Sequence, residues 1–130
     1  MNVVDSSCWL GFVEDSSIGN AVAPVIADVE HLLVPTIVLY EVFRKLAAME
    51  DSVYANGFIQ EMLNADVVPL DASLSISTAN ISRKFQLPMA DSIIYATTMQ
   101  YNAVLWTADK HFENLPNVRY FDKTQREELI

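Results

Sequence analysis

Short runs of β-branched and other apolar residues alternate with longer segments of helical spacing along this chain, and that alternation limits the folds open to it. Strands that alternate with helices pair in parallel, and the helices cover both faces of the sheet. The sequence therefore predicts an α/β fold with a central, mostly parallel sheet of four or five strands. The expected strands are residues 3–4, 32–34, 67–68, 104–106 and 118–121.

The segments between these strands predict helices. The clearest covers about 36–49, where Pro35 and Thr36 give a start signal and apolar residues recur every three or four positions. Asp71 is expected as the N-cap of a later helix, and Pro88 as the first residue of the last one. The remaining helices are expected over about 51–64, 71–85 and 88–101, with one or two shorter ones between residues 8 and 27.

The composition sets limits on class and location. A length of 130 residues, 52% of them hydrophobic, fits a single domain over 1–130 with a real core. Cys8 is the only cysteine, which excludes an internal disulfide and a cysteine-based zinc site, and we expect a small buried thiol. The chain starts with no signal-like segment, and no window is long enough to span a membrane. A cytosolic (cytoplasmic) protein is expected.

The net charge of −9 is strongly acidic for a domain of this size. A nucleic-acid binder usually carries a basic footprint, because phosphate contacts supply most of its affinity. The charge alone therefore argues against nucleic acid. The same charge is equally typical of a protein that gathers carboxylates around divalent cations or docks onto a basic partner. The placement of the carboxylates decides between these interpretations.

Four acidic residues fall where an α/β fold places its functional crevice, beyond the carboxyl ends of the strands. Asp5 directly follows the first strand, and Asp109 comes just beyond the strand at 104–106. Glu41 is a charge inside an apolar helical stretch, and its side chain should lean back toward the sheet edge. Asp91 lies in the first turn of the helix that Pro88 opens.

Each of these acids also has a modest structural interpretation. Asp5 and Asp109 suit helix N-caps, Asp91 complements a helix dipole, and Glu41 with Lys45 could form an exposed pair. Their shared placement is more informative, because four adjacent carboxylates repel one another unless a cation compensates them. Hard oxygen ligands favour Mg²⁺ or Mn²⁺. Such an ion can bridge an acidic pocket to RNA phosphate and activate water, which removes the objection from net charge.

Other polar residues near the expected site have simpler interpretations. His111 follows Asp109 closely, and we expect an ordinary surface residue at a helix start rather than a catalytic histidine. Asp71 and Asp122 also follow expected strands. We exclude both from the site, because Asp71 is a good N-cap and the strands concerned should lie at the edges of the sheet.

Four stretches of this chain together resemble the PIN domain family, and in particular the VapC-type toxins of type II toxin–antitoxin systems. The resemblance covers nearly the whole length, and the third and fourth stretches are the most specific. The stretches are Val3-Val4-Asp5-Ser6-Ser7, Pro35-Thr36-Ile37-Val38-Leu39-Tyr40-Glu41-Val42, Leu87-Pro88-Met89-Ala90-Asp91-Ser92-Ile93-Ile94-Tyr95-Ala96 and Leu105-Trp106-Thr107-Ala108-Asp109-Lys110-His111-Phe112.

The resemblance implies a three-layer α/β/α sandwich and a Mg²⁺- or Mn²⁺-dependent endoribonuclease that forms a homodimer and is inhibited by an antitoxin protein. It carries the family's four catalytic and metal-binding acids onto Asp5, Glu41, Asp91 and Asp109. It also implies a hydroxyl two residues before the last acid, which is Thr107. We expect Thr107 and Ser6 to orient carboxylates through hydrogen bonds.

The predicted function is cleavage of RNA phosphodiester bonds by the toxin of a toxin–antitoxin pair. Two alternatives stay within the same family: an RNA-processing nuclease outside such a pair, and a catalytically silent domain that only binds a partner. A phosphate-accepting receiver domain is a rival from another class. That rival would need paired acids after the first strand and a lysine at the end of a late strand. Here Asp5 stands alone, and Trp106-Thr107 ends the late strand.

Overall fold

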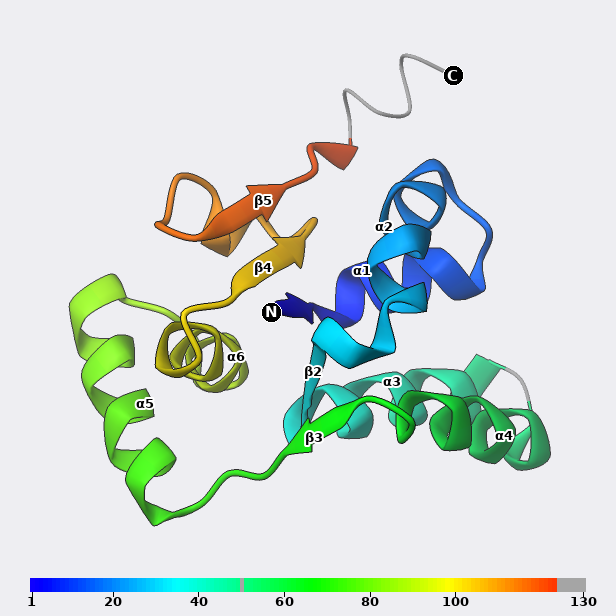
Figure 1. The fold of residues 1–130 in the computed structure, drawn as a ribbon, viewed down its shortest axis with the longest axis horizontal. Helices are drawn as coiled ribbons and strands as arrows, with labels where there is room; N and C mark the ends of the chain where they lie inside the picture. The colour runs from blue at the N-terminus through cyan, green and yellow to red at the C-terminus, as the bar shows by residue number, and fades with distance from the viewer. Residues whose placement is uncertain (50, 124–130) are drawn as a thin grey trace.

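The computed structural model describes residues 1–49 and 51–123 (Figure 1). A five-stranded sheet lies at the centre, and every strand pairs with its neighbours in parallel. The predicted α/β fold with a parallel sheet covered on both faces is therefore confirmed, while residues 124–130 of the expected single domain lie outside the described residues. The elements are β1 (Asn2–Val4), α1 (Ser6–Val13), α2 (Ser17–Ala27), the 3-10 helix η1 (Val29–His31), β2 (Leu32–Pro35), α3 (Thr36–Met49), α4 (Ser52–Met62), β3 (Asp66–Val68), α5 (Ala72–Phe85), α6 (Met89–Gln100), β4 (Val104–Thr107), the 3-10 helix η2 (Lys110–Phe112) and β5 (Val118–Tyr120).

The order of the strands, β3-β2-β1-β4-β5, places β1 in the middle of the sheet. The chain first moves outward from β1 through β2 to β3, and then crosses back to β4 on the other side of β1. Right-handed crossovers that run in opposite directions put their helices on opposite faces. Figure 1 shows this arrangement, with α5 and α6 on one side of the sheet and α1 to α4 on the other.

The direction of the connections reverses between β1 and β4, which makes their carboxyl ends the switch point of the sheet. Asp5 directly follows β1, and Asp109 comes two residues after β4 ends. The edge strands are β3 and β5, as expected for the strands that precede Asp71 and Asp122. The fold thus brings two of the predicted acids to the one position where an α/β sheet opens a crevice.

Helix α6 is buried along most of its length, from Ser92 to Thr98. It packs against α5, α3 and the strands β1, β2 and β4. Because it has neighbours on several sides, it is buried on more than the single face that a surface helix buries. Its buried hydroxyls are satisfied within the helix, because Thr97 and Thr98 each donate to the carbonyl four residues earlier. This rigid central helix carries Asp91 on its first turn.

The helix ends follow the predicted signals, with small differences. Asp71 caps α5 by accepting a hydrogen bond from the Leu74 N–H at 2.8 Å, and two helices occupy the stretch between residues 8 and 27. Pro88 is the N-cap of α6 rather than its first residue, because its ψ of 161° is extended. Among the described residues, no helix is long and apolar enough to cross a membrane.

Candidate metal-dependent active site

Asp5 is a buried carboxylate at the end of the central strand, with 3% of its surface exposed. It occupies the N-cap position of α1, but its side chain makes no capping hydrogen bond. Instead, its Oδ2 accepts hydrogen bonds from the hydroxyls of Ser7 and Thr107, each at 2.8 Å. Asp5 is thus the N-cap residue by position, but its carboxylate does not act as a helix cap. The hydroxyls of Thr107 on β4 and Ser7 on α1 fix the orientation of this carboxylate.

The same two hydroxyls join the carboxyl ends of β1 and β4. Thr107 Oγ1 accepts a hydrogen bond from the Asp109 N–H at 2.9 Å, and Ser7 Oγ accepts one from the Ala108 N–H at 3.1 Å. Thr107 thus contacts Asp5, as we predicted for a residue that orients a carboxylate. Ser7 makes an equivalent contact with Asp5, two residues before it, which sequence reasoning missed. Its other partner, the Ala108 N–H, lies 101 residues away in the chain.

Burial and neighbouring charge raise the pKa of the Asp5 carboxyl. Loss of solvent is the largest cause, and the charge of Asp109 adds to it. Hydrogen bonds from Ser7 and Thr107 act in the opposite direction, because they stabilise the charged form. A bound cation would offset both the burial of this carboxylate and its repulsion by the neighbouring acid.

Glu41 lies in the second turn of α3 and faces the same region. Its Oε1 atom is buried and has no hydrogen-bond partner among the described residues. Burial raises the pKa of this carboxyl, the charges of Asp5 and Asp109 raise it further, and hydrogen bonding from the Ser6 side chain opposes them. The described residues give Glu41 no ion pair with Lys45, so the exposed-pair interpretation is wrong. Ser6 lies where we predicted, beside a carboxylate of the site.

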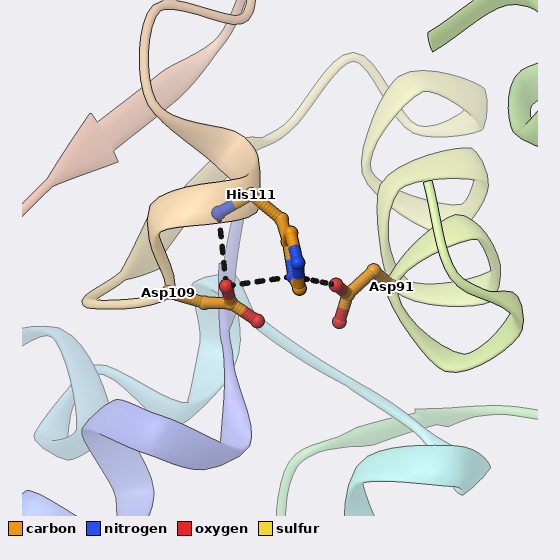
Figure 2. Close-up of side chains that lie close together, drawn as sticks. All are labelled: Asp91, Asp109 and His111. Carbon is orange, nitrogen blue, oxygen red and sulfur yellow. Dashed lines mark hydrogen bonds and ion pairs between the residues drawn. The ribbon is translucent and has the colours of Figure 1, made fainter. Parts of the chain in front are cut away.

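Asp91 and Asp109 approach each other from opposite elements, and His111 lies between them (Figure 2). His111 Nδ1 is 2.8 Å from Asp91 Oδ2 and 3.0 Å from Asp109 Oδ1. Asp109 also caps η2 by accepting a hydrogen bond from the His111 N–H at 2.9 Å. Its predicted N-cap role is confirmed, and the same carboxylate also belongs to the cluster.

Asp91 is partly buried and lies near two other acids of the site. Burial, then the charges of Asp109 and Asp5, raise its pKa to about 6, while His111 acts in the opposite direction. In turn, the charge of Asp109 above all raises the pKa of His111. Perturbed carboxyls that face one another in this way are typical of functional sites, and here each perturbation has a named neighbour.

The structure therefore brings Asp5, Glu41, Asp91 and Asp109 close enough for their charges to act on one another. The residues present fit a divalent cation for two reasons. The buried Glu41 Oε1 lacks a partner that a cation or its water would supply, and carboxylate oxygens are the donors that Mg²⁺ and Mn²⁺ accept. His111 adds a nitrogen donor to these oxygens. We had expected this histidine to be an ordinary surface residue. Its spacing of two from Asp109 is the signal that could have found it.

A parallel sheet with a carboxylate cluster at its switch point defines an α/β protein with the donor set of a metal-dependent hydrolase. The chain belongs to the PIN domain family, whose model matches residues 3–118. This membership implies a nuclease. No curated protein gave a significant sequence match.

Solved structures share the fold at low sequence identity. A toxin–antitoxin complex from Klebsiella pneumoniae is 15% identical with a TM-score of 0.76, covering 92% of this chain and 96% of that one. VapBC2 from Rickettsia felis, bound to a DNA fragment from its promoter, is 14% identical with a TM-score of 0.71, covering 93% and 98%. PAE2754 from Pyrobaculum aerophilum is 18% identical with a TM-score of 0.68, covering 98% and 93%.

Proposed function

We propose that this protein is a Mg²⁺- or Mn²⁺-dependent endoribonuclease, and that it is the toxin component of a type II toxin–antitoxin pair in the cytoplasm. The observation that carries the proposal is the buried, hydroxyl-bound carboxylate of Asp5 beside three further acids at the switch point of a PIN domain. Such a cluster has no use in packing. It suits a cation that connects the acids to a phosphate group.

The residues divide into ligands and residues that orient them. Asp5 and Asp91 would hold the metal, and Glu41 and Asp109 would assist through water or a second ion. When bound, the metal supplies a nucleophilic water at neutral pH and charge stabilisation at the leaving oxygen. Thr107 keeps Asp5 in position through its 2.8 Å hydrogen bond.

The remaining hydroxyls have the same kind of task. Ser7 donates to the same oxygen of Asp5 from α1, and Ser6 lies against Glu41. Partners that fix ligands in this way are worth about 10- to 100-fold in metal affinity or activity. The protein thus contributes preorganised ligands, and little rearrangement of Asp5 is needed before a cation enters.

The proposal of a toxin role draws on the similar structures. One of them is described as a toxin–antitoxin complex, and three others are VapBC or FitAB structures described as bound to DNA. The match covers more than nine-tenths of this chain and of each of those chains. By analogy, we propose a homodimer that acts on RNA and that a cognate antitoxin inhibits.

RNA cleavage by the purified chain tests the nuclease directly. With Mg²⁺ or Mn²⁺, the wild type should cut transfer, ribosomal or messenger RNA, and EDTA should abolish cutting. Asp91→Asn should lower the rate by about a hundredfold or more, since losing even an outer partner of a metal site costs about 10- to 100-fold. Asp66→Asn is the matched control. Asp66 is exposed at the start of β3, whereas the site lies at the carboxyl ends of the strands, so this variant should cut RNA normally. Equal cutting by wild type and Asp91→Asn, or none by either, would overturn the proposal.

Growth of bacteria that express the chain tests the toxin role separately. Expression of the wild type should arrest growth, and Asp91→Asn should relieve the arrest. Co-expression of a short, DNA-binding partner encoded beside the gene should also relieve it and should co-purify with the chain. An active nuclease that neither arrests growth nor binds such a partner would be an RNA-processing enzyme outside a toxin–antitoxin pair.

A further inference from the structure

The His111 side chain points at two carboxylates of the site rather than into the protein. It follows β4 on the short helix η2, and across from it lies Asp91 at the start of α6 (Figure 2). Its Nδ1 atom is 2.8 Å from Asp91 Oδ2 and 3.0 Å from Asp109 Oδ1. Three donor atoms from three residues therefore converge on one point.

Neither packing nor the local turn requires this imidazole. The side chain is 59% exposed, so it buries little apolar surface. The backbone N–H of His111, not its ring, completes the cap of Asp109 at 2.9 Å. What the ring adds is its contact with the two acids, so its position needs a chemical explanation.

The distances are those of adjacent ligands on one metal ion. With metal–ligand distances of about 2.1 Å and octahedral geometry, neighbouring ligands lie about 3.0 Å apart. His111 Nδ1 stands at this separation from both oxygens, and all three donor atoms lie within 4.8 Å of one another. A cation could enter between them with small side-chain movements.

We propose that His111 Nδ1 is a direct metal ligand beside Asp91 and Asp109, and that this nitrogen makes the site prefer Mn²⁺ to Mg²⁺. The inference deepens the proposed function, since it rests on a divalent cation at that same site and assigns Asp109 to direct binding of an ion rather than to binding through water. Carboxylates alone suit Mg²⁺ well, whereas an imidazole nitrogen favours transition-metal ions. A cation bound at Nδ1 would displace any proton on that nitrogen to solvent, because a histidine ligand must be deprotonated at the donor atom.

Pulsed electron paramagnetic resonance of bound Mn²⁺ tests the ligand, because it detects the nitrogen nucleus of a directly bound imidazole. The chain has two histidines, and His31 provides a matched control. His31 precedes β2 at the other end of the sheet and pairs with Asp28 at 3.0 Å. The nitrogen coupling should appear in the wild type and in His31→Gln, and it should be lost in His111→Gln.

Metal titration of the same proteins without RNA tests the preference. His111→Gln and His111→Ala should weaken Mn²⁺ binding by about tenfold or more, the lower end of what losing an outer partner costs a metal site. Mg²⁺ binding should weaken less, so the ratio of the two Kd values should move toward Mg²⁺. Unfolding curves recorded without metal establish that the variants fold.

The opposite interpretation makes His111 a cation that merely fills the site until metal displaces it. In that case the wild type shows no nitrogen coupling, and His111→Gln binds Mn²⁺ as tightly or more tightly. Either result would overturn the inference. If the variants do not fold, wild type labelled with ¹⁵N-histidine serves instead, because a true ligand changes the coupling to that of the new isotope.

The outcomes separate this inference from the nuclease itself. Nitrogen coupling without RNA cleavage would refute the proposed function and leave the ligand standing. RNA cleavage without nitrogen coupling would refute the ligand and leave the nuclease standing.

Discussion

The Thr107 hydroxyl donates a 2.8 Å hydrogen bond to Oδ2 of Asp5, which precedes it by 102 residues. The same hydroxyl oxygen accepts a 2.9 Å hydrogen bond from the Asp109 N–H. One side chain on β4 therefore positions one acid of the site directly and another through its backbone. Because Thr107 is itself fully buried, water cannot replace it.

Thr107→Val keeps the shape of this side chain and removes only the hydroxyl. It should destabilise the protein by about 1–3 kcal/mol, because buried polar groups lose their partner. It should also weaken Mn²⁺ binding by about 10- to 100-fold, since Asp5 loses an orienting hydrogen bond. Thr107→Ser, which keeps the hydroxyl, is the control. Urea unfolding and metal titration measure both effects, and a valine variant that binds metal like the serine variant would contradict this role.

Local signals in the sequence were enough to predict the fold. The β-branched runs marked all five strands, and helical spacing marked α3 to the residue. Asp71 capped its helix as its position predicted. These features depend on neighbours in the chain, so pattern and spacing determine them. The boundaries that moved, such as the start of α6 at Met89, depend on one backbone torsion angle.

The site was harder to predict, because its contacts are long-range. Sequence reasoning placed Asp5, Glu41, Asp91 and Asp109 at the correct edge but left a structural interpretation open for each. For Asp5, the hydrogen bond from Thr107 favours a site role over helix capping. For Glu41, the buried Oε1 without a partner favours a site role over an exposed ion pair. For Asp109 the alternatives were not exclusive, since it caps η2 and also faces Asp91.

The raised pKa of Asp91 predicts an unusual pH dependence of stability without metal. A carboxyl whose pKa rises from 3.8 to about 6 on folding stabilises the folded state below pH 3.8. That contribution is lost as the pH rises through 6, because ionised Asp91 is then a partly buried charge that also lies near the charges of Asp109 and Asp5. Asp91→Asn removes both the buried charge and the repulsion, so in EDTA at pH 8 it should be more stable than wild type by about 2 kcal/mol.

Urea unfolding in EDTA at several pH values measures this difference. The two proteins should converge below about pH 4, where Asp91 is protonated in both folded and unfolded chains. Asp66→Asn, on the exposed end of an edge strand, should track wild type throughout. An Asp91→Asn variant that is less stable than wild type at pH 8 would show that the acids do not strain the metal-free fold.

Mn²⁺ should restore the folding stability that the ionised acids remove in the metal-free protein. A ligand that binds only the folded state stabilises it by about 2.7 kcal/mol at a hundred times its Kd. Above pH 6 the Asp91 carboxylate is ionised and available, so the melting temperature should rise clearly with Mn²⁺. At pH 5 protons compete for the same groups and the rise should shrink. Asp91→Asn should show little response at either pH, and a response equal to wild type would place the metal elsewhere.

Two glycines in helices should respond in opposite ways to the same substitution. A Cβ at Gly19 in α2 would lie 2.2 Å from the carbonyl oxygen of Gly11 in α1, so Gly19→Ala must push these helices apart. At Gly57 in α4 a Cβ meets nothing within 4 Å. Gly57→Ala should therefore stabilise the protein by about 0.5–1 kcal/mol through helix propensity.

Gly19→Ala should destabilise by more than that gain, on the order of 1–3 kcal/mol, as overpacking does. Since α1 begins at Ser6 and carries Ser7, the displacement should also disturb the hydroxyls that hold Asp5, and Mn²⁺ binding should weaken with stability. Gly57→Ala should bind Mn²⁺ like wild type. Thermal unfolding and metal titration of the pair check both statements. A Gly19→Ala protein as stable as wild type would mean that α1 and α2 do not pack this closely.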